Sequence, residues 1–237
     1  DAAFVANYLF YADGYATYLK NSKYYYRKRS DGSSTLDKAW EHPGLYSSVL
    51  TKGCIESMMR YVRIGQEIPY SLQITILYHL IWYIKRLVNN DEKISFLTDA
   101  QRKEFTENIY NAFSYIDDKV ILEFGLAGSW FFHKVGILSQ FKKSDPTFQI
   151  VYIESYDQKK QLAQLRYFSG SPQLERIEID GKDCLPVYAK TISHDFLSQT
   201  FVLERRIWVP VSAKEKMTVK ISNIKTTISL GGQQKND

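Results

Sequence analysis

The sequence predicts an α+β protein of several parts, with a helical region in the middle and an all-β, sandwich-like domain at the C-terminal end. Two observations predict this fold class. From about residue 43 to 145 the apolar residues recur at the spacing of a helix, and from residue 146 onward short segments alternate between polar and apolar residues. The turn-forming Ser144-Asp145-Pro146 lies at the change of period. We therefore expect three parts, at residues 1–42, 43–145 and 146–237.

The first part is predicted to hold one helix and two short strands. Phe4, Tyr8 and Leu9 fall on one face of a helix, which Asp13-Gly14 ends. Strands are expected at residues 15–19 and 23–28, and residues 30–34 form a loop rich in hydroxyl groups.

Several start signals mark the helices of the second part. Tyr46, Leu50 and Met58 belong to one amphipathic pattern, and Pro69 stands where a second helix begins. Thr98 and Gln101 have the spacing of a capping box, which opens a third helix. Residues 116–141 are predicted to add one or two more, with an interruption at residues 125–128.

The third part is predicted to consist of short strands joined by turns. Asp180-Gly181 is a strong signal for a two-residue hairpin. Strands of this number and length indicate an all-β sandwich or barrel. The expected strands are residues 149–155, 162–168, 175–179, 207–211, 217–221 and 224–228.

Composition bounds the class of protein. The chain has 237 residues, of which 44% are hydrophobic and 15% aromatic, enough for a buried core and too many for global disorder. The net charge of +5 is a mild excess that fits an anionic ligand or an anionic membrane surface. It is too low, and its cations are too scattered, for a nucleic-acid partner.

Cysteines and histidines argue against disulfides and metal sites. Cys54 and Cys184 are the two cysteines, and the four histidines show no metal-binding spacing. No secretory signal opens the chain, and the longest apolar run, residues 74–84, is too short to cross a bilayer. We expect a cytoplasmic location, with peripheral contact to the inner face of the plasma membrane as an alternative. The opening DAAFVANYLF reads as the middle of a domain, so we expect a piece of a longer protein.

The stretch KYYYRKRSDGSS, residues 23–34, is the strongest candidate binding site. On the expected strand Arg27 and Arg29 point to one face and Lys28 to the other. Paired guanidinium groups suit phosphate oxygens, and the following loop with Ser33 and Ser34 supplies hydroxyl and backbone N–H groups. The alternative is a solvated edge strand whose charges prevent aggregation.

The order of an acidic residue, an amphipathic helix, a strand and YYYRKR-x-DGSS resembles the end of the GT-A catalytic domain in family 2 glycosyltransferases of bacterial surface polysaccharides. The resemblance implies that Asp1 is the catalytic base, and that Arg27, Lys28, Arg29, Ser33 and Ser34 bind the donor diphosphate or a phosphate-bearing acceptor. It also implies a nucleotide-sugar donor, a glycan or lipid-linked acceptor, and residues 1–42 as the remnant of the catalytic domain. The other reading of Asp1 is a helix N-cap.

Later segments extend this resemblance. EIPYSLQITILYHLIWYIKR, SYIDDKVIL and FVLERRIWVPV resemble the appendages of capsule and teichoic-acid-type transferases. In the family, a Rossmann-like half with an acidic metal motif lies upstream, so a divalent cation, Mg²⁺ or Mn²⁺, is expected in the full-length enzyme and none in this fragment. Asp117-Asp118 stands in a helical context, which does not suit that motif. The fragment alone is therefore expected to be inactive.

Aromatic clusters leave a second function open. We expect the stripe of Tyr78, Trp82, Tyr83, Lys85 and Arg86, and the run from Trp130 to Lys134, to be core packing, with a membrane-facing helix as the weaker alternative. Trp208 is expected to pack in a core or at an oligomer interface, because Ile207 and Val209 flank it. The alternative function is a non-catalytic module for binding an anionic glycan polymer or a partner enzyme, or for homo-oligomerisation.

Overall fold

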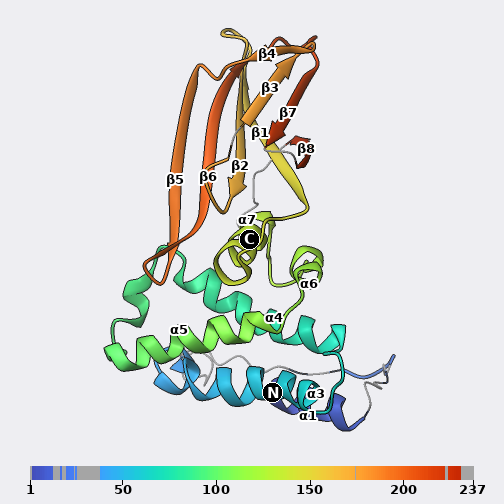
Figure 1. Ribbon diagram of the computed structural model, residues 1–237, viewed down its shortest axis with the longest axis vertical. Coiled ribbons are helices and arrows are strands. Elements are labelled where there is room, and N and C mark those ends of the chain that lie inside the picture. Colours follow the sequence, from blue (N-terminus) through green and yellow to red (C-terminus); the bar gives the residue numbers. More distant parts are fainter. Residues whose placement is uncertain are drawn as a thin grey trace. The chain divides into compact units, whose positions relative to one another are not determined.

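The computed structural model describes residues 2–12, 17, 20–23, 25, 38–173, 175–221 and 224–230. The chain divides into two units, Asp1–Ala127 and Gly128–Asp237, here called the helical unit and the sheet unit. Figure 1 shows helices in the first and mainly strands in the second, which confirms the α+β class. The division into three parts, with a boundary near residue 145, stays a prediction.

Helices of the helical unit begin where the sequence signals predict. Pro69 immediately precedes α4, and Thr98 caps α5 in a complete capping box, accepting a hydrogen bond from the Gln101 backbone N–H at 3.3 Å. α3 ends before Gly65, whose φ of 71° lies in the left-handed region that glycine favours. The elements are α1 (Ala2–Tyr11), η1 (Pro43–Leu45), η2 (Val49–Ile55), α3 (Glu56–Arg63), α4 (Tyr70–Leu87), η3 (Asp91–Ile94), α5 (Asp99–Ser114) and α6 (Asp118–Glu123).

The core of the helical unit is built around α4 and α5. Ile76 and Leu80 of α4 and Phe105 of α5 are fully buried. Tyr46 lies among them, with its ring centroid 5.1 Å from that of Phe105 and 6.0 Å from that of Tyr83. Such edge-to-face aromatic contacts fix the helices against one another.

In its described residues, the sheet unit begins with two short helices and continues with eight strands. Six of the strands lie where the sequence predicts them, whereas β4 and β5 were not predicted. The elements are α7 (Phe131–Ile137), η4 (Leu138–Lys142), β1 (Phe148–Asp157), β2 (Leu162–Ser169), β3 (Glu175–Ile179), β4 (Lys182–Cys184), β5 (Tyr188–Phe196), β6 (Gln199–Pro210), β7 (Met217–Ile221) and β8 (Lys225–Leu230).

Within the described residues these strands form two sheets, in the order β5-β6-β2-β1-β8 and β4-β3-β7. All neighbouring strands are antiparallel except β1 and β8, which are parallel. The predicted hairpin is confirmed, since Asp180 and Gly181 join β3 to β4 with φ values of 46° and 77°.

One hydrophobic core joins the two sheets. Leu165, Ile207 and Val209 of the large sheet and Ile177 and Val219 of the small sheet all belong to it. Because side chains alternate along a strand, the residues between these point to the opposite face of the large sheet. That opposite face carries the site described below.

α7 packs against the large sheet through aromatic side chains. The Phe132 ring lies 5.4 Å from that of Phe168 and 5.9 Å from that of Phe201, and Trp130 stacks on Phe132 at 5.2 Å. His133 is 6% exposed and its Nδ1 accepts a hydrogen bond from the Trp130 backbone N–H. The prediction that this run is a packed segment is therefore confirmed. None of the helices in the described part has the length and apolarity needed to cross a bilayer.

Candidate functional site

Every residue that the sequence nominates for catalysis or substrate binding lies outside the described residues. These are Asp1, Arg27, Lys28, Arg29, Ser33 and Ser34. Their assignments, and the strand predicted at residues 23–28, stay predictions.

The helix that directly follows Asp1 is described, and α3 holds it in place. Arg60 donates a hydrogen bond from Nη1 to Oδ1 of Asn7, and its guanidinium lies 6.0 Å from the Phe10 ring centroid. The Phe10 ring meets that of Tyr61 edge-on at 5.0 Å. The apolar residues Phe4 and Tyr8, by contrast, are 73% and 55% exposed. The packed side of α1 is therefore the side of Asn7 and Phe10.

The aromatic and basic stripe on α4 divides into core and surface. Tyr83 is buried and donates its hydroxyl hydrogen bond to the Leu45 carbonyl at 2.7 Å, and burial raises its pKa. Trp82 is 40% exposed, with the Lys85 Nζ 5.1 Å from its ring centroid. Core packing is confirmed for Tyr83, and a membrane-facing role for Trp82 stays a prediction.

Asp117 serves the start of α6, as its helical context predicts. Its Oδ2 accepts a hydrogen bond of 2.8 Å from Gln73, and its backbone N–H donates one of 2.7 Å to the same amide. Gln73 is 3% exposed, so this pair fastens the beginning of α4 to the beginning of α6. Within the described residues, no group of three or more His, Cys, Asp or Glu side chains could hold a metal ion.

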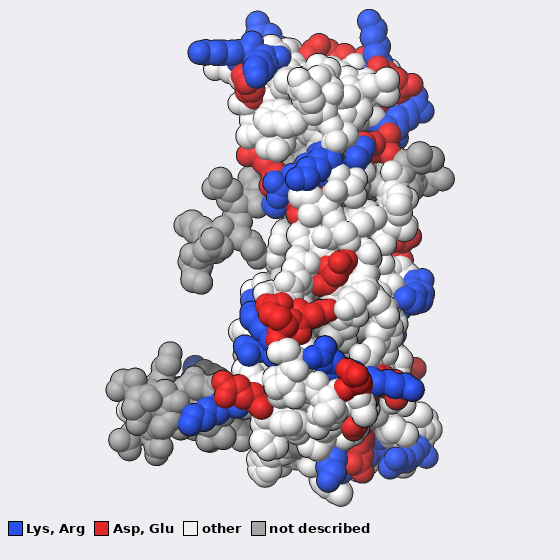
Figure 2. Space-filling view, turned by 90° about the vertical axis from the view of Figure 1, so that its left-hand side faces the viewer, with Lys and Arg blue, Asp and Glu red and all other residues white. Residues whose placement is uncertain are grey.

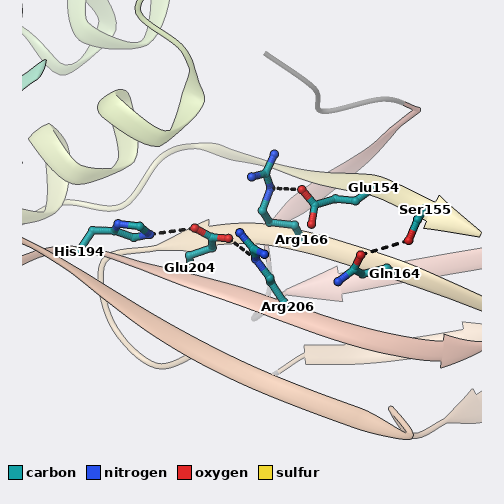
Figure 3. Close-up of polar contacts among 7 residues, drawn as sticks. All are labelled: Glu154, Ser155, Gln164, Arg166, His194, Glu204 and Arg206. Atoms are coloured by element: carbon teal, nitrogen blue, oxygen red, sulfur yellow. Dashed lines mark hydrogen bonds and ion pairs between the residues drawn. The ribbon is translucent and has the colours of Figure 1, made fainter. Parts of the chain in front are cut away.

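The main polar cluster of the sheet unit is centred on Glu204 of β6 (Figure 3). Its Oε2 lies 2.8 Å from Nε2 of His194 on β5, and its Oε1 accepts a hydrogen bond from Nε of Arg206. Glu204 is only 4% exposed, so its carboxylate depends on these partners rather than on water. The arrangement is a buried anion with cationic or hydrogen-bonding groups on both sides.

The net effect of these surroundings is a lowered pKa of Glu204. Desolvation raises this pKa, but the hydrogen bonds from His194 and Arg206 and the charges of Arg206 and Arg166 together outweigh it. A carboxylate held in its ionised form in this way is a weak general base. The cluster therefore suits the positioning of cations better than proton transfer.

Arg166 of β2 is held in the same region by a carboxylate and three aromatic rings. Its Nε lies 2.9 Å from Oε1 of Glu154. Its guanidinium carbon lies 5.4 to 5.9 Å from the ring centroids of Phe168, Trp130 and Tyr152. Nearby, Ser155 and Gln164 hydrogen-bond at 3.1 Å between β1 and β2 (Figure 3).

We call this face of the large sheet the open face. Strand register places the residues of neighbouring strands side by side on it, in rows that run across the sheet. One row across β5, β6, β2 and β1 reads Tyr188, Trp208, Gln164 and Ser155. The next row reads Lys190, Arg206, Arg166 and Tyr152. One row is thus aromatic and polar, and the next is cationic.

Trp208 lies on the open face and not in the core. Ile207 and Val209 point into the core, so strand alternation places Trp208 on the other side, where it is half-buried. The expectation that its apolar neighbours draw Trp208 into that core is wrong, and a role at an oligomer interface stays a prediction. Figure 2, which views the molecule from the side on which β5 lies, shows basic side chains beside an uncharged area of this unit.

Sequence reasoning missed the contribution of β5. Tyr188 and Lys190 come from this strand, whose residues are mostly exposed and lack an apolar alternation. The turn from β5 to β6 uses Leu197 and Ser198 at φ values of 52° and 59°, without the glycine or asparagine that marks such turns. His194 and Asp195, two polar residues of the same strand, belong to no sequence motif that would have marked β5.

Comparison with known proteins gives one partial similarity. The chain is 32% identical over 108 residues to GgaB, a minor teichoic acid biosynthesis protein of Bacillus subtilis (strain 168). No profile of a known protein family matches the chain, and no solved structure matches it. The matched segment covers 44% of this chain and 11% of the length of GgaB. The chain is therefore distantly and partially similar to a protein of teichoic acid biosynthesis.

Proposed function

We propose that this chain is the C-terminal portion of a family 2 glycosyltransferase, which transfers a sugar from a nucleotide-sugar donor to a teichoic-acid-type surface polysaccharide. The observation that carries the proposal is the 32% identity with GgaB, whose name places it in teichoic acid biosynthesis. The YYYRKR-x-DGSS segment, with its resemblance to the acceptor side of GT-A domains, supports the reaction type.

Asp1 is the proposed general base, which removes the proton from the acceptor hydroxyl as that oxygen attacks the anomeric carbon of the sugar and displaces the nucleoside diphosphate, whose bond to that carbon breaks. Arg27, Lys28 and Arg29, with Ser33 and Ser34, are proposed to bind the diphosphate or a phosphate on the acceptor. The packing of α1 on α3 through Asn7 and Phe10 supports this, because a catalytic group next to a fixed helix can be held in a productive position.

A divalent cation is expected for the family, on the upstream half. The described residues do not fit it, since no cluster of metal-binding side chains is found among them and Asp117 is occupied by Gln73. No step of the proposed reaction is therefore assigned to metal-binding residues of the described part.

The test uses the full-length gene product and a nucleoside diphosphate sugar whose sugar is radiolabelled. Transfer to purified teichoic acid is measured for the wild type and for Asp1→Asn. We expect transfer to fall by about 100-fold or more, because the lost group is the general base. Donor affinity, measured by calorimetry, should remain as in the wild type.

Asp145→Asn is the matched control, because Asp145 is exposed and lies between η4 and β1, far from the motif in sequence. Arg27→Ala and Arg29→Ala should instead weaken binding of the donor or of a phosphorylated acceptor. Transfer that survives Asp1→Asn contradicts the assignment of the base. A full-length protein that transfers no sugar from any nucleotide donor contradicts the proposal as a whole.

A second candidate is a non-catalytic module that binds an anionic glycan polymer or a partner enzyme. The observation that favours it is the open face, where an aromatic row lies beside a cationic row. It predicts polymer binding without transfer, whereas the enzyme predicts both.

A further inference from the structure

We propose that the open face of the large sheet binds the acceptor polymer itself, an anionic chain that carries both sugar rings and phosphate groups. The choice of polymer rests on the proposed function, and the binding surface rests on the sheet unit alone. The surface consists of Tyr188, Trp208, Lys190, Arg206 and Arg166.

The cationic row places three positive charges side by side, and one of them, on Lys190, has no partner among the described residues. Lys190, Arg206 and Arg166 are direct neighbours on three adjacent strands, an arrangement of like charges that costs stability unless anions compensate it. Arg206 forms an ion pair with Glu204, and Arg166 forms one with Glu154. Lys190 is exposed, and within the described part of the chain its ammonium group makes no hydrogen bond or ion pair. The row therefore has room for an external anion.

Two of these cations are held in place before a ligand arrives. Arg166 is clamped between Glu154 and aromatic rings, and its side chain is 12% exposed. Arg206 directs its Nε to the buried Glu204, while its side chain stays 40% exposed. Because the Glu204 carboxylate is itself fastened to His194, the contact at Nε holds the partly exposed Arg206 guanidinium in place. Such preorganisation lowers the entropy cost of binding.

The aromatic row offers flat surface for sugar rings. Tyr188 is 66% exposed, and Trp208 lies directly opposite it on β6. Cross-strand partners have Cβ atoms about 5 Å apart, so two separate aromatic rings are offered on neighbouring strands of the open face. Within the described residues neither the Tyr188 hydroxyl nor the Trp208 indole N–H has a hydrogen-bond partner, so both can bind a ligand hydroxyl.

The spacing of the two rows suits a polymer in which sugars and phosphates are neighbours. Residues two apart on a strand lie about 7 Å from each other, so the aromatic row runs parallel to the cations at about this distance. The three cations span about 10 Å across β5, β6 and β2, which is longer than a single sugar ring. A free phosphate would use the cations alone, and an uncharged glycan would use the aromatic row alone.

The test measures binding of the full-length protein to four probes by calorimetry. The probes are a poly(glycerol phosphate) teichoic acid with sugar substituents, the same polymer without sugars, dextran of matched length, and inorganic phosphate. We expect the sugar-substituted polymer to bind most tightly, and its affinity to fall as salt rises because charges contribute.

Substitutions at two positions of the open face are compared with two controls elsewhere in the sheet unit. Trp208→Ala should weaken binding of the sugar-substituted polymer about tenfold or more, and Trp208→Phe should restore most of it. Lys190→Ala should weaken binding about threefold at low salt and less at high salt. The controls are Tyr156→Ala, an aromatic residue of β1 that pairs with Ala163 and so lies on the opposite face, and Lys182→Ala on β4. Both controls should bind as the wild type does.

The outcomes separate this inference from the proposed function. Unchanged binding in Trp208→Ala and Lys190→Ala, or no binding of the sugar-substituted polymer, overturns the inference even if sugar transfer is observed. Binding that depends on Trp208 and Lys190 in a protein without transferase activity upholds the inference and overturns the proposed function. Equal affinity for dextran, or full competition by millimolar inorganic phosphate, also overturns it, because either shows that one row is not used.

Discussion

His194 and Glu204 link the edge strand β5 to β6 through a contact of 2.8 Å between Nε2 and Oε2. The carboxylate is almost fully buried and also binds Arg206, so one acidic side chain fixes both the edge of the large sheet and a cation of the open face. The stability of the edge and the positioning of that cation are therefore coupled.

Glu204 should make the stability of the β5–β6 region depend on pH. Its folded-state pKa is lowered below the ordinary 4.5, so its contribution is fully present above about pH 4.5 and is lost as the pH falls through the folded pKa. Glu204→Gln should lower the free energy of unfolding by about 1–3 kcal/mol at pH 7. Hydrogen exchange of β6 amides measures this, and the difference from the wild type should shrink below pH 4.5.

Glu215→Gln is the control for this prediction, because Glu215 is an exposed turn residue that accepts a bond from the Ser212 backbone N–H. We expect its effect to stay below about 1 kcal/mol. A difference for Glu204→Gln that stays constant from pH 7 to pH 3 would show that ionisation of Glu204 is not its source.

Gly136 should be required for the docking of α7 on the large sheet. A Cβ atom at this position would lie 2.2 Å from Cε1 of the fully buried Phe201 ring. Gly136→Ala must displace that ring or the helix, so we expect the sheet unit to lose about 1–3 kcal/mol of stability. Thermal unfolding followed by near-ultraviolet circular dichroism measures it.

Gly125→Ala serves as the comparison, because a Cβ at Gly125 meets no atom within 4 Å. It should leave the melting temperature within about a degree of the wild type. If the two variants melt together, the close approach of Gly136 and Phe201 does not limit stability.

Tyr167 should stabilise an ion pair on the core side of the large sheet. Its hydroxyl donates a hydrogen bond of 2.6 Å to Oε2 of Glu175, whose other oxygen lies 2.7 Å from Nη2 of Arg205. Tyr167→Phe keeps the ring and removes the donor, so the expected loss is about 0.5–1.5 kcal/mol in urea unfolding at pH 7. Tyr156→Phe is the control, because its hydroxyl bonds an exposed Gln161 amide and should cost less. A Tyr167→Phe protein as stable as the wild type would show that Arg205 alone satisfies Glu175.

The elements with strong local signals were predictable from the sequence. α5 begins at the Thr98 capping box, whose side chains bind the free backbone N–H groups of the first turn. The hairpin turns at Asp180-Gly181, because these residue types accept the positive φ values that the turn requires. β5 was not predictable, since as an edge strand it needs no alternating apolar face and its turn uses Leu197 and Ser198.

The open face depends on information that local sequence does not carry. In the sequence, Trp208 between Ile207 and Val209 resembles a core residue. Side chains alternate along a strand, however, so Ile207 and Val209 point into the core and Trp208 points to the opposite face. Lys190, Arg206 and Arg166 are far apart in the chain and become neighbours only through strand register. The predicted residues Asp1, Arg27 and Arg29 remain predictions, because they lie outside the described residues.

The two cysteines should differ in their reactivity toward thiol reagents. Cys54 is 3% exposed, and burial raises the pKa of its thiol to about 12, so almost no thiolate forms at pH 8. Burial also raises the pKa of Cys184, which is only half-buried. In the native protein at pH 8 we expect iodoacetamide to label Cys184 at least about tenfold faster than Cys54, as measured by peptide mass spectrometry. In 8 M urea the two rates should converge.

The variant Cys184→Ser isolates Cys54. Under native conditions this variant should show almost no labelling. Rapid native labelling would instead mean that η2 opens readily enough to expose Cys54.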